Sequence, residues 1–265
     1  MNVSLDTIVN LAKRRGFVWP GSEIYGGLAN SWDYGPVGVL LKNNLRDAWW
    51  RDFVTSRSDM VGLDAAILMN PRVWEASGHV AHFTDPLVED MVTHERWRAD
   101  ELVAQAVGKS VEGVSVEELG RLIADHDIKS PAGNELTAPR VFSLLFETQV
   151  GPAQGKQSMV YLRGELAQSM FVGFKRVAAT MRRVPPFGVA QAGKVFRNEI
   201  TPGNFTFRTL EFDLMEFEYF VKEAEWERWF EYWLTEMQRW AVEVVGLQAD
   251  RLRVREHSRE ELSHY

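Results

Sequence analysis

The sequence contains no cysteine among its 265 residues. Disulfide bridges and thiolate metal sites are therefore excluded, which fits a reducing compartment such as the cytoplasm. Residues 1–15 lack the apolar core of a secretory signal, and no apolar run is long enough to span a bilayer. We therefore expect a cytoplasmic protein without a membrane partner.

The sequence also lacks an excess of positive charge. Its net charge is −7, so the chain as a whole is not a general clamp for nucleic acid and we expect no DNA partner, although a local basic patch could contact RNA. With 45% hydrophobic and 25% charged residues, the length suits one large domain, or one domain with an insertion.

A glycine-rich phosphate loop after a strand is also missing, which argues against a dinucleotide-binding fold. Hydrophobic periodicity and Pro or Gly boundaries predict helices and strands throughout the chain. Helices are expected over 6–15, from Pro36 onward, and over 165–182 and 223–245, with strands over 60–69 and 158–163. The tryptophans of the last helix are interpreted as a core stripe.

These elements predict a mixed α/β fold of the α+β type, in which helices flank a mostly antiparallel sheet. Residues 100–127 are predicted to be helical and acidic, and a turn-rich stretch follows at 130–134. We interpret residues 100–137 as a helical subdomain inserted into a core that covers residues 1–265.

The most informative stretch reads as a strand over 196–199, a short loop, and a returning strand over 207–216. Alternate residues of a strand share a face, so one face would gather two cations, a ring and two carboxylates. A guanidinium grips phosphate oxygens at two points, and a ring stacks on a base, so this face predicts a nucleotide site. The alternative is a ladder of salt bridges on a solvated face. The residues concerned are Arg197, Glu199, Arg208, Phe212 and Glu216.

These patterns resemble a known family. The helix, strand and proline between Pro36 and Pro71 are similar to the first signature motif of the class II aminoacyl-tRNA synthetases, and the hairpin is similar to their second. Further phrases resemble glycyl-tRNA synthetases of the homodimeric type, and the resemblance covers nearly the whole chain. These phrases are residues 22–27, 33–36, 77–79, 85–86 and 197–205.

The resemblance implies an enzyme, a glycine–tRNA ligase. It would use ATP and Mg²⁺ to convert glycine to glycyl-adenylate, and would then pass glycine to tRNA(Gly). Arg197 would be the catalytic residue and hold the α-phosphate and the glycine carboxylate, while Arg208 would hold the far phosphates. Glu199 would contact the adenine amino group, and Phe212 would stack on the ring. The implied ATP-binding residues are Arg197, Asn198, Glu199, Phe207, Arg208, Thr209, Leu210, Glu211 and Phe212.

The resemblance also implies an amino-acid pocket, in which Glu165 and Glu216 would receive the glycine ammonium. Glycine has no side chain to recognise, so a small pocket must select it by excluding larger ligands. Glu165 could instead cap a helix, and Arg98 could form a surface ion pair. We favour such a purely structural role more for Arg98 than for Glu165. The implied glycine-site residues are Arg98, Glu165, Phe212, Asp213, Leu214, Met215 and Glu216.

The sequence departs from the family pattern in three respects. No third signature motif, with its second ATP-binding arginine, and no anticodon-binding domain are found before Tyr265, so residues 1–265 alone should bind ATP weakly and turn over little. Segments 142–147, 163–169 and 212–216 differ from the usual forms at the amino-acid pocket. A non-catalytic binding or regulatory relative, or an enzyme that loads another amino acid, therefore stays an alternative. Because cysteine is absent, no zinc is expected.

Overall fold

The computed structural model describes residues 3–111, 113–151, 158–200, 203 and 205–257. The chain divides into two compact units, and each is built from segments that are distant in the sequence. The first unit comprises residues 1–67, 165–195 and 211–256, and the second comprises residues 68–164, 196–210 and 257–265. Among the described residues, no helix is long and apolar enough to cross a membrane.

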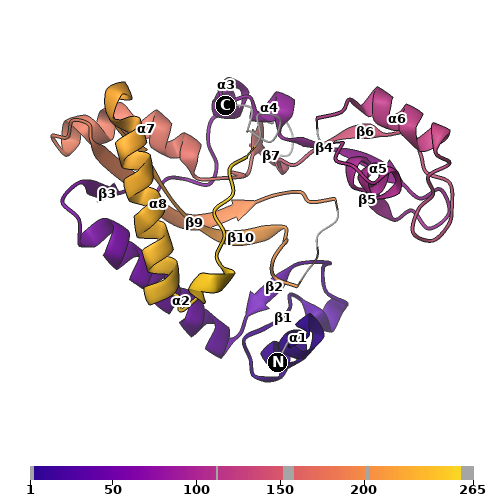
Figure 1. Cartoon of the computed structure of the whole chain (residues 1–265), viewed down its shortest axis with the longest axis horizontal. Coiled ribbons are helices and arrows are strands. Elements are labelled where there is room, and N and C mark those ends of the chain that lie inside the picture. The colour runs from indigo at the N-terminus through magenta and orange to yellow at the C-terminus, as the bar shows by residue number, and fades with distance from the viewer. Residues whose placement is uncertain (1–2, 112, 152–157, 201–202, 204, 258–265) are drawn as a thin grey trace. The chain divides into compact units, whose positions relative to one another are not determined.

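The first unit is centred on a three-stranded sheet with the order β10-β9-β3 (Figure 1). β3 runs parallel to β9, with Met60 opposite Gly188. A separate antiparallel pair joins β1 and β2. Its elements are α1 (Leu5–Arg14), β1 (Val18–Pro20), β2 (Trp32–Tyr34), α2 (Pro36–Trp50), a π-helical turn (Arg51–Thr55), β3 (Met60–Gly62), α7 (Ala167–Thr180), β9 (Phe187–Phe196), β10 (Glu211–Phe220) and α8 (Trp226–Glu243). Short 3₁₀ turns occur at Glu23–Tyr25, Glu223–Glu225 and Ala249–Arg251.

Strand β10 carries large apolar side chains on both faces because helices cover both sides of this sheet. Its odd-numbered side chains Met215, Phe217 and Tyr219 pack with a cluster that contains Trp49, Phe53 and Trp240, from α2, the π-helical turn and α8. Its even-numbered side chains face a second cluster on α7. The members of that second cluster include Leu166, Met170, Phe174, Phe187, Val189, Phe212, Leu214 and Phe220.

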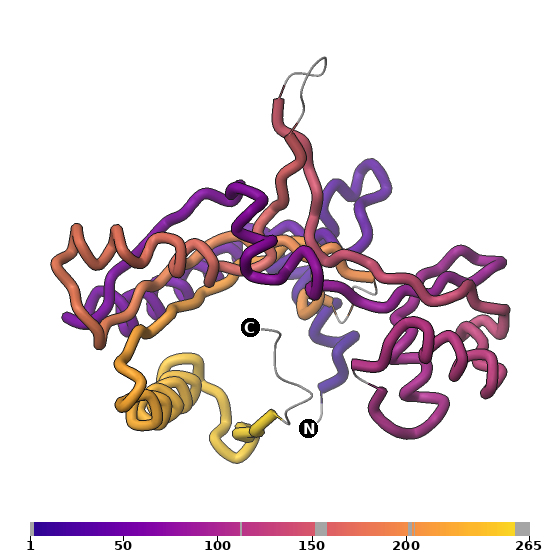
Figure 2. Tube along the Cα trace, turned by 90° about the horizontal axis from the view of Figure 1, so that it is seen from above, coloured from indigo at the N-terminus to yellow at the C-terminus, as the bar shows by residue number. Residues whose placement is uncertain are grey.

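The second unit contains an antiparallel three-stranded sheet with the order β5-β4-β6 and an antiparallel pair, β7 and β8. Helices α5 and α6 pack with this sheet around a core that includes Val88, Val103 and Leu119; these segments are purple to magenta in Figure 2. Its elements are α3 (Pro71–Ala76), α4 (His79–His82), β4 (Thr84–Glu89), β5 (Arg96–Arg98), α5 (Ala99–Val107), α6 (Val116–Asp125), β6 (Arg140–Ser143), β7 (Glu147–Val150) and β8 (Ser158–Tyr161).

The predicted helices are confirmed, except that the region expected to be helical over 100–127 forms two helices, α5 and α6, with non-helical residues between them. A mixed fold of helices and antiparallel sheets is also confirmed. The expectation of one mostly antiparallel sheet is wrong in detail, since the described strands form four small sheets and β3 pairs in parallel. The strand expected over 60–69 ends at Gly62, because the chain soon leaves the first unit after residue 67. That the region 100–137 is an inserted subdomain stays a prediction.

The predicted core stripe of the last helix is only partly correct. Trp233 and Trp240 pack in the core of the first unit. Trp226 and Phe230, by contrast, are 54% and 62% exposed. Helical spacing places a side chain on a face, but the neighbouring elements decide how wide a stripe is buried.

Gly38 on α2 provides a test of the packing in the first unit. A Cβ atom at this position would lie 1.9 Å from the Phe17 carbonyl oxygen, whereas one at Gly173 on α7 would meet Leu63 at 3.7 Å and Val177 at 4.0 Å, which are ordinary contacts. We expect Gly38→Ala to lower the free energy of unfolding by about 2 kcal/mol or more. The matched Gly173→Ala should raise it by roughly 0.5–1 kcal/mol, because alanine favours a helix. Urea unfolding of both variants checks this, and equal stabilities would contradict the packing described.

Candidate functional site

The segment after β9 is held by backbone bonds from several directions. The Arg197 amide donates to the Leu210 carbonyl at 3.0 Å, and the Asn198 amide donates to the Leu144 carbonyl at 2.8 Å. β9 ends at Phe196, and Arg208 lies outside β10 in an isolated bridge with Gly203. The prediction that 196–199 continues the strand is therefore wrong, because the chain turns to bond with Leu144. Thr201, Pro202 and Asn204 of the connecting loop lie outside the described residues.

Arg197 is held by two contacts of its side chain within the second unit. Its Nε atom donates to the Gly164 carbonyl at 3.1 Å. Its guanidinium lies over the Phe83 ring, 5.3 Å from the centroid. This stacking suits a delocalised planar cation and fixes its direction. The Arg197 cation is therefore oriented by the Gly164 carbonyl and the Phe83 ring.

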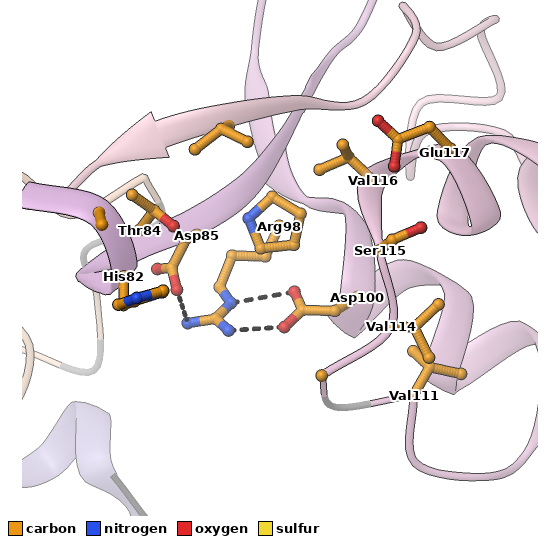
Figure 3. Close-up of a pocket in the computed structure, with 14 residues that line it drawn as sticks. His82, Thr84, Asp85, Arg98, Asp100, Val111, Val114, Ser115, Val116 and Glu117 are labelled. Carbon is orange, nitrogen blue, oxygen red and sulfur yellow. Dashed lines mark hydrogen bonds and ion pairs between the residues drawn. The ribbon is translucent and has the colours of Figure 1, made fainter. Parts of the chain in front are cut away.

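Arg98, at the end of β5, is surrounded by carboxylates (Figure 3). Its guanidinium lies 2.9 Å from Asp85, 2.6 Å from Asp100 and 3.4 Å from Glu101. Burial opposes the charge of Arg98, but the hydrogen bond to Asp100 and the attraction of Asp85 raise its pKa above the ordinary value. The ion pair anticipated as the alternative for Arg98 is present, and its side chain is only 22% exposed.

Asp85 is a buried carboxyl group beside this arginine. Burial raises the pKa of Asp85 to about 6, with the charges of Asp100 and Glu199 adding to the shift and those of Arg98 and Arg208 opposing it. Asp85, Arg98 and Asp100 line a cavity of about 600 Å³. The cavity lies wholly within the second unit, between β4 and the start of α6 (Figure 3).

Arg208 and Glu199 lie in the same electrostatic neighbourhood. Arg208 is 3.9 Å from Glu199 and 3.6 Å from Glu101, which also contacts Arg98. These distances are longer than those of a tight ion pair, and the Arg208 side chain is 38% exposed. Carboxylates thus hold this arginine loosely, and an anion with more charge can compete for it.

The remaining predicted ATP-site residues lie in different surroundings. Phe207 is 84% exposed and Thr209 is buried. Leu210 accepts the backbone bond from Arg197, and Glu211 pairs with Lys194 at 2.7 Å. Phe212 belongs to the first unit and is half-buried against the cluster on α7.

Glu165 and Glu216, both in the first unit, lie beside the start of α7. The Leu166 amide donates to Glu216 Oε2 at 3.1 Å, and Gln168 Nε2 donates to Glu165 Oε1 at 2.5 Å. The helix begins at Ala167, and its N-cap residue is Leu166. Glu165 thus lies one residue before the N-cap, where a carboxylate suits the helix dipole, and its role as a cap stays a prediction. The two carboxylates predicted to receive an ammonium group are gathered at one end of one helix.

The other predicted glycine-site residues on β10 are not gathered there. Leu214 packs in the apolar cluster on α7, and Met215 faces the opposite side of the sheet. Asp213 is paired with Lys42 at 3.0 Å and with Lys194 at 3.5 Å.

Further polar residues of the first unit, on α7, β9 and β10, were not singled out by sequence reasoning. Ser169 is buried, and its hydroxyl donates to the Leu166 carbonyl at 2.7 Å and lies 3.0 Å from Gln191 Oε1. Gln191 on β9 is fully buried. Glu218 shares the parity of Glu216 on β10. That parity was visible in the sequence, but the contact between Ser169 on α7 and Gln191 on β9 was not.

Comparison with known proteins identifies the relatives. No family model matches the chain. Three curated proteins named glycine–tRNA ligase cover nearly all of it. Those of Geobacillus kaustophilus (strain HTA426) and Caldanaerobacter subterraneus subsp. tengcongensis are 51% and 50% identical over 272 residues, and that of Nocardia farcinica is 50% identical over 266. The chain is homologous to the glycine–tRNA ligases.

The homology confirms the resemblance inferred from the motifs. The chain spans 59%, 59% and 55% of these three glycine–tRNA ligases, and 98–100% of the chain is matched. A solved structure described as the RNA binding domain of threonyl-tRNA synthetase from Cryptosporidium parvum Iowa II covers 89% of this chain. The match includes 42% of that structure, with a TM-score of 0.51 and 13% identity, and therefore indicates a shared fold alone.

Proposed function

We propose that the protein to which this chain belongs is a class II glycine–tRNA ligase. It activates glycine with ATP to glycyl-adenylate and then transfers glycine to tRNA(Gly), in the cytoplasm. The observation that carries the proposal is the 48–51% identity to glycine–tRNA ligases along the whole chain. Pyrophosphate exchange that depends on glycine tests it.

The chemistry requires positioning and charge neutralisation. The glycine carboxylate is already ionised, so it attacks the α-phosphorus without a general base, and pyrophosphate leaves. Arg197 is the residue proposed to stabilise the charge on the α-phosphate, and its orientation by Gly164 and Phe83 supports that role. Arg208 is proposed to bind the far phosphates. The triphosphate would compete with Glu101 and Glu199 for this arginine.

The placement of the His, Asp and Glu side chains also bears on how Mg²⁺ would bind. Among the described residues, no group of three or more His, Asp or Glu side chains is placed to hold a metal ion. Mg²⁺ prefers phosphate oxygens and water, with one or two carboxylates. We propose that Mg²⁺ arrives with ATP and adds to the neutralisation of the phosphates, while the arginines orient them.

The glycine ammonium is proposed to bind between Glu165 and Glu216. Both carboxylates lie beside the first residues of α7, one of them held by Gln168 and the other by the Leu166 amide. Two carboxylates fixed by hydrogen bonds present a preorganised negative site for a compact cation. A small pocket at these carboxylates would exclude a side chain larger than that of glycine by its size.

We also propose that the protein is a homodimer formed through α2. Val37, Leu40, Leu41 and Leu45 on this helix are 42%, 62%, 59% and 38% exposed, so the predicted apolar stripe lies largely at the surface of its unit. Such a patch is typical of an interface. The double substitution Leu40→Glu and Leu41→Glu should shift the protein from dimer to monomer in sedimentation at micromolar concentration. A wild-type monomer under those conditions would contradict the proposal.

A further inference from the structure

Glu218 lies where a charge is difficult to accommodate. It follows Glu216 by two residues on β10, so both side chains point to the face that packs on α7. That face is otherwise apolar, with Leu214 and Phe220 on the same strand. Three carboxylates, those of Glu165, Glu216 and Glu218, therefore lie on or beside this face within the first unit.

Two buried amides beside these carboxylates have atoms without a hydrogen-bond partner among the described residues. Gln168 is 6% exposed, and its Oε1 atom lacks a donor although its Nε2 atom is bonded to Glu165. Gln191 is fully buried, and its Nε2 atom lacks an acceptor. An unsatisfied buried polar atom costs about 1–3 kcal/mol, so the acceptor Gln168 Oε1 beside these carboxylates points to a ligand that brings a donor. The Gln191 Nε2 atom is itself a donor and does not point to such a ligand.

The hydrogen-bonding groups around these carboxylates indicate the kind of ligand. The carboxylates and the Gln168 carbonyl are all acceptors, and they lie at the start of α7. The described carboxylates are not arranged as a metal site. A primary ammonium group carries three N–H donors and one positive charge, which matches several acceptors with an excess of negative charge.

We propose that Glu218 is a third carboxylate of this ammonium site, which holds a proton while the site is empty and releases it when an ammonium group binds. The inference rests on the proposed function, since glycine is the expected ligand. Glu218 is a positioning residue, because it acts on the ligand through the summed charge of the pocket.

The proton balance follows from the groups that face Glu218. Burial, followed by the charges of Glu216 and Glu165, raises the pKa of Glu218 to about 7. The polar side chains of α7 and β9 that are bonded to Glu165 or to one another, Gln168, Ser169 and Gln191, are neutral. An ammonium group adds one positive charge, favours the ionised carboxylate and sends the proton to solvent. Glycine affinity should therefore rise as the pH increases through 7.

Titration calorimetry of the product of the whole reading frame tests this linkage. Glycine binding is measured near pH 7 in buffers with different ionisation enthalpies, which reveals the protons released. We expect about half a proton per glycine, because a group with this pKa is about half protonated there. Glu218→Gln should bind glycine without that release. The exposed Glu243→Gln on α8, where Glu243 pairs with Arg239, should behave as the wild type.

Methylammonium and acetate separate the inference from the proposed function. Methylammonium should release protons as glycine does, and acetate should not. Protons released by methylammonium in a protein that does not bind glycine would refute the proposed function and support the role of Glu218. Glycine binding without proton release in the wild type would overturn the inference and leave the proposed function intact.

A second measurement covers the case in which Glu218→Gln does not fold. Carboxyl carbon resonances of labelled glutamates should show one group that titrates near pH 7 in the wild type. Glu165→Gln should lower that pKa, because it removes a neighbouring negative charge. If every glutamate titrates near its ordinary value, or if Glu165→Gln has no effect, the proposal is wrong.

Discussion

Replacing Arg197 with alanine is expected to lower the rate of glycine activation by about 100-fold or more. Loss of one preorganised partner for transition-state charge has an effect of this size. Arg197 is oriented by the Gly164 carbonyl and the Phe83 ring, so its charge is in position before the phosphate arrives. The measurement is ATP–pyrophosphate exchange by the whole gene product, together with a melting curve for each variant.

Arg140 provides the matched control for Arg197. Its side chain is 60% exposed and lies 3.6 Å from Glu89, so it belongs to a surface ion pair. Arg140→Ala should leave exchange unchanged and alter stability by less than about 1 kcal/mol. If Arg197→Ala behaves like this control, Arg197 is not part of the site.

The second large effect is expected for Glu216→Gln, which should raise the KM for glycine by roughly 30-fold to 100-fold. The substitution removes a charge-assisted hydrogen bond to the ammonium, worth about 2–3 kcal/mol. The glutamine oxygen can still accept the bond that the Leu166 amide now donates to Glu216, so the local fold should persist.

The KM for ATP separates the binding of glycine from general damage to the enzyme. It should stay within about twofold of the wild type in Glu216→Gln, because a local change at the ammonium site leaves the binding of ATP unchanged. Glu243→Gln, on α8 with its partner Arg239, should change neither constant. A parallel rise in both KM values would mean that Glu216 supports the fold of the first unit and not the ammonium.

The helices could be predicted from the sequence because their signals are local. Pro36 begins α2, Gly16 closely follows α1, and apolar periodicity marks α7 and α8. The exposed Trp226 and Phe230 show where such reasoning ends, since periodicity gives the face and tertiary neighbours decide its burial.

The strands were less predictable because their partners are distant in the sequence. β3 has three residues and pairs with β9, more than a hundred residues later. Arg197 leaves the strand pattern because its neighbour Asn198 bonds to Leu144 in another segment. Identification of the site residues depended on their chemical type and on the family resemblance. Glu218 became notable only when the buried Gln168 and Gln191, on α7 and β9, were found to have atoms without a partner among the described residues.

The central claim, that the protein activates glycine, is tested most directly by ATP–pyrophosphate exchange with single amino acids. The product of the whole reading frame is supplied in turn with glycine, alanine and serine. We predict exchange with glycine at least about 100-fold faster than with either of the others, because a pocket sized for glycine excludes a larger side chain. Exchange that depends on alanine or serine, or no exchange with any amino acid, would contradict the account.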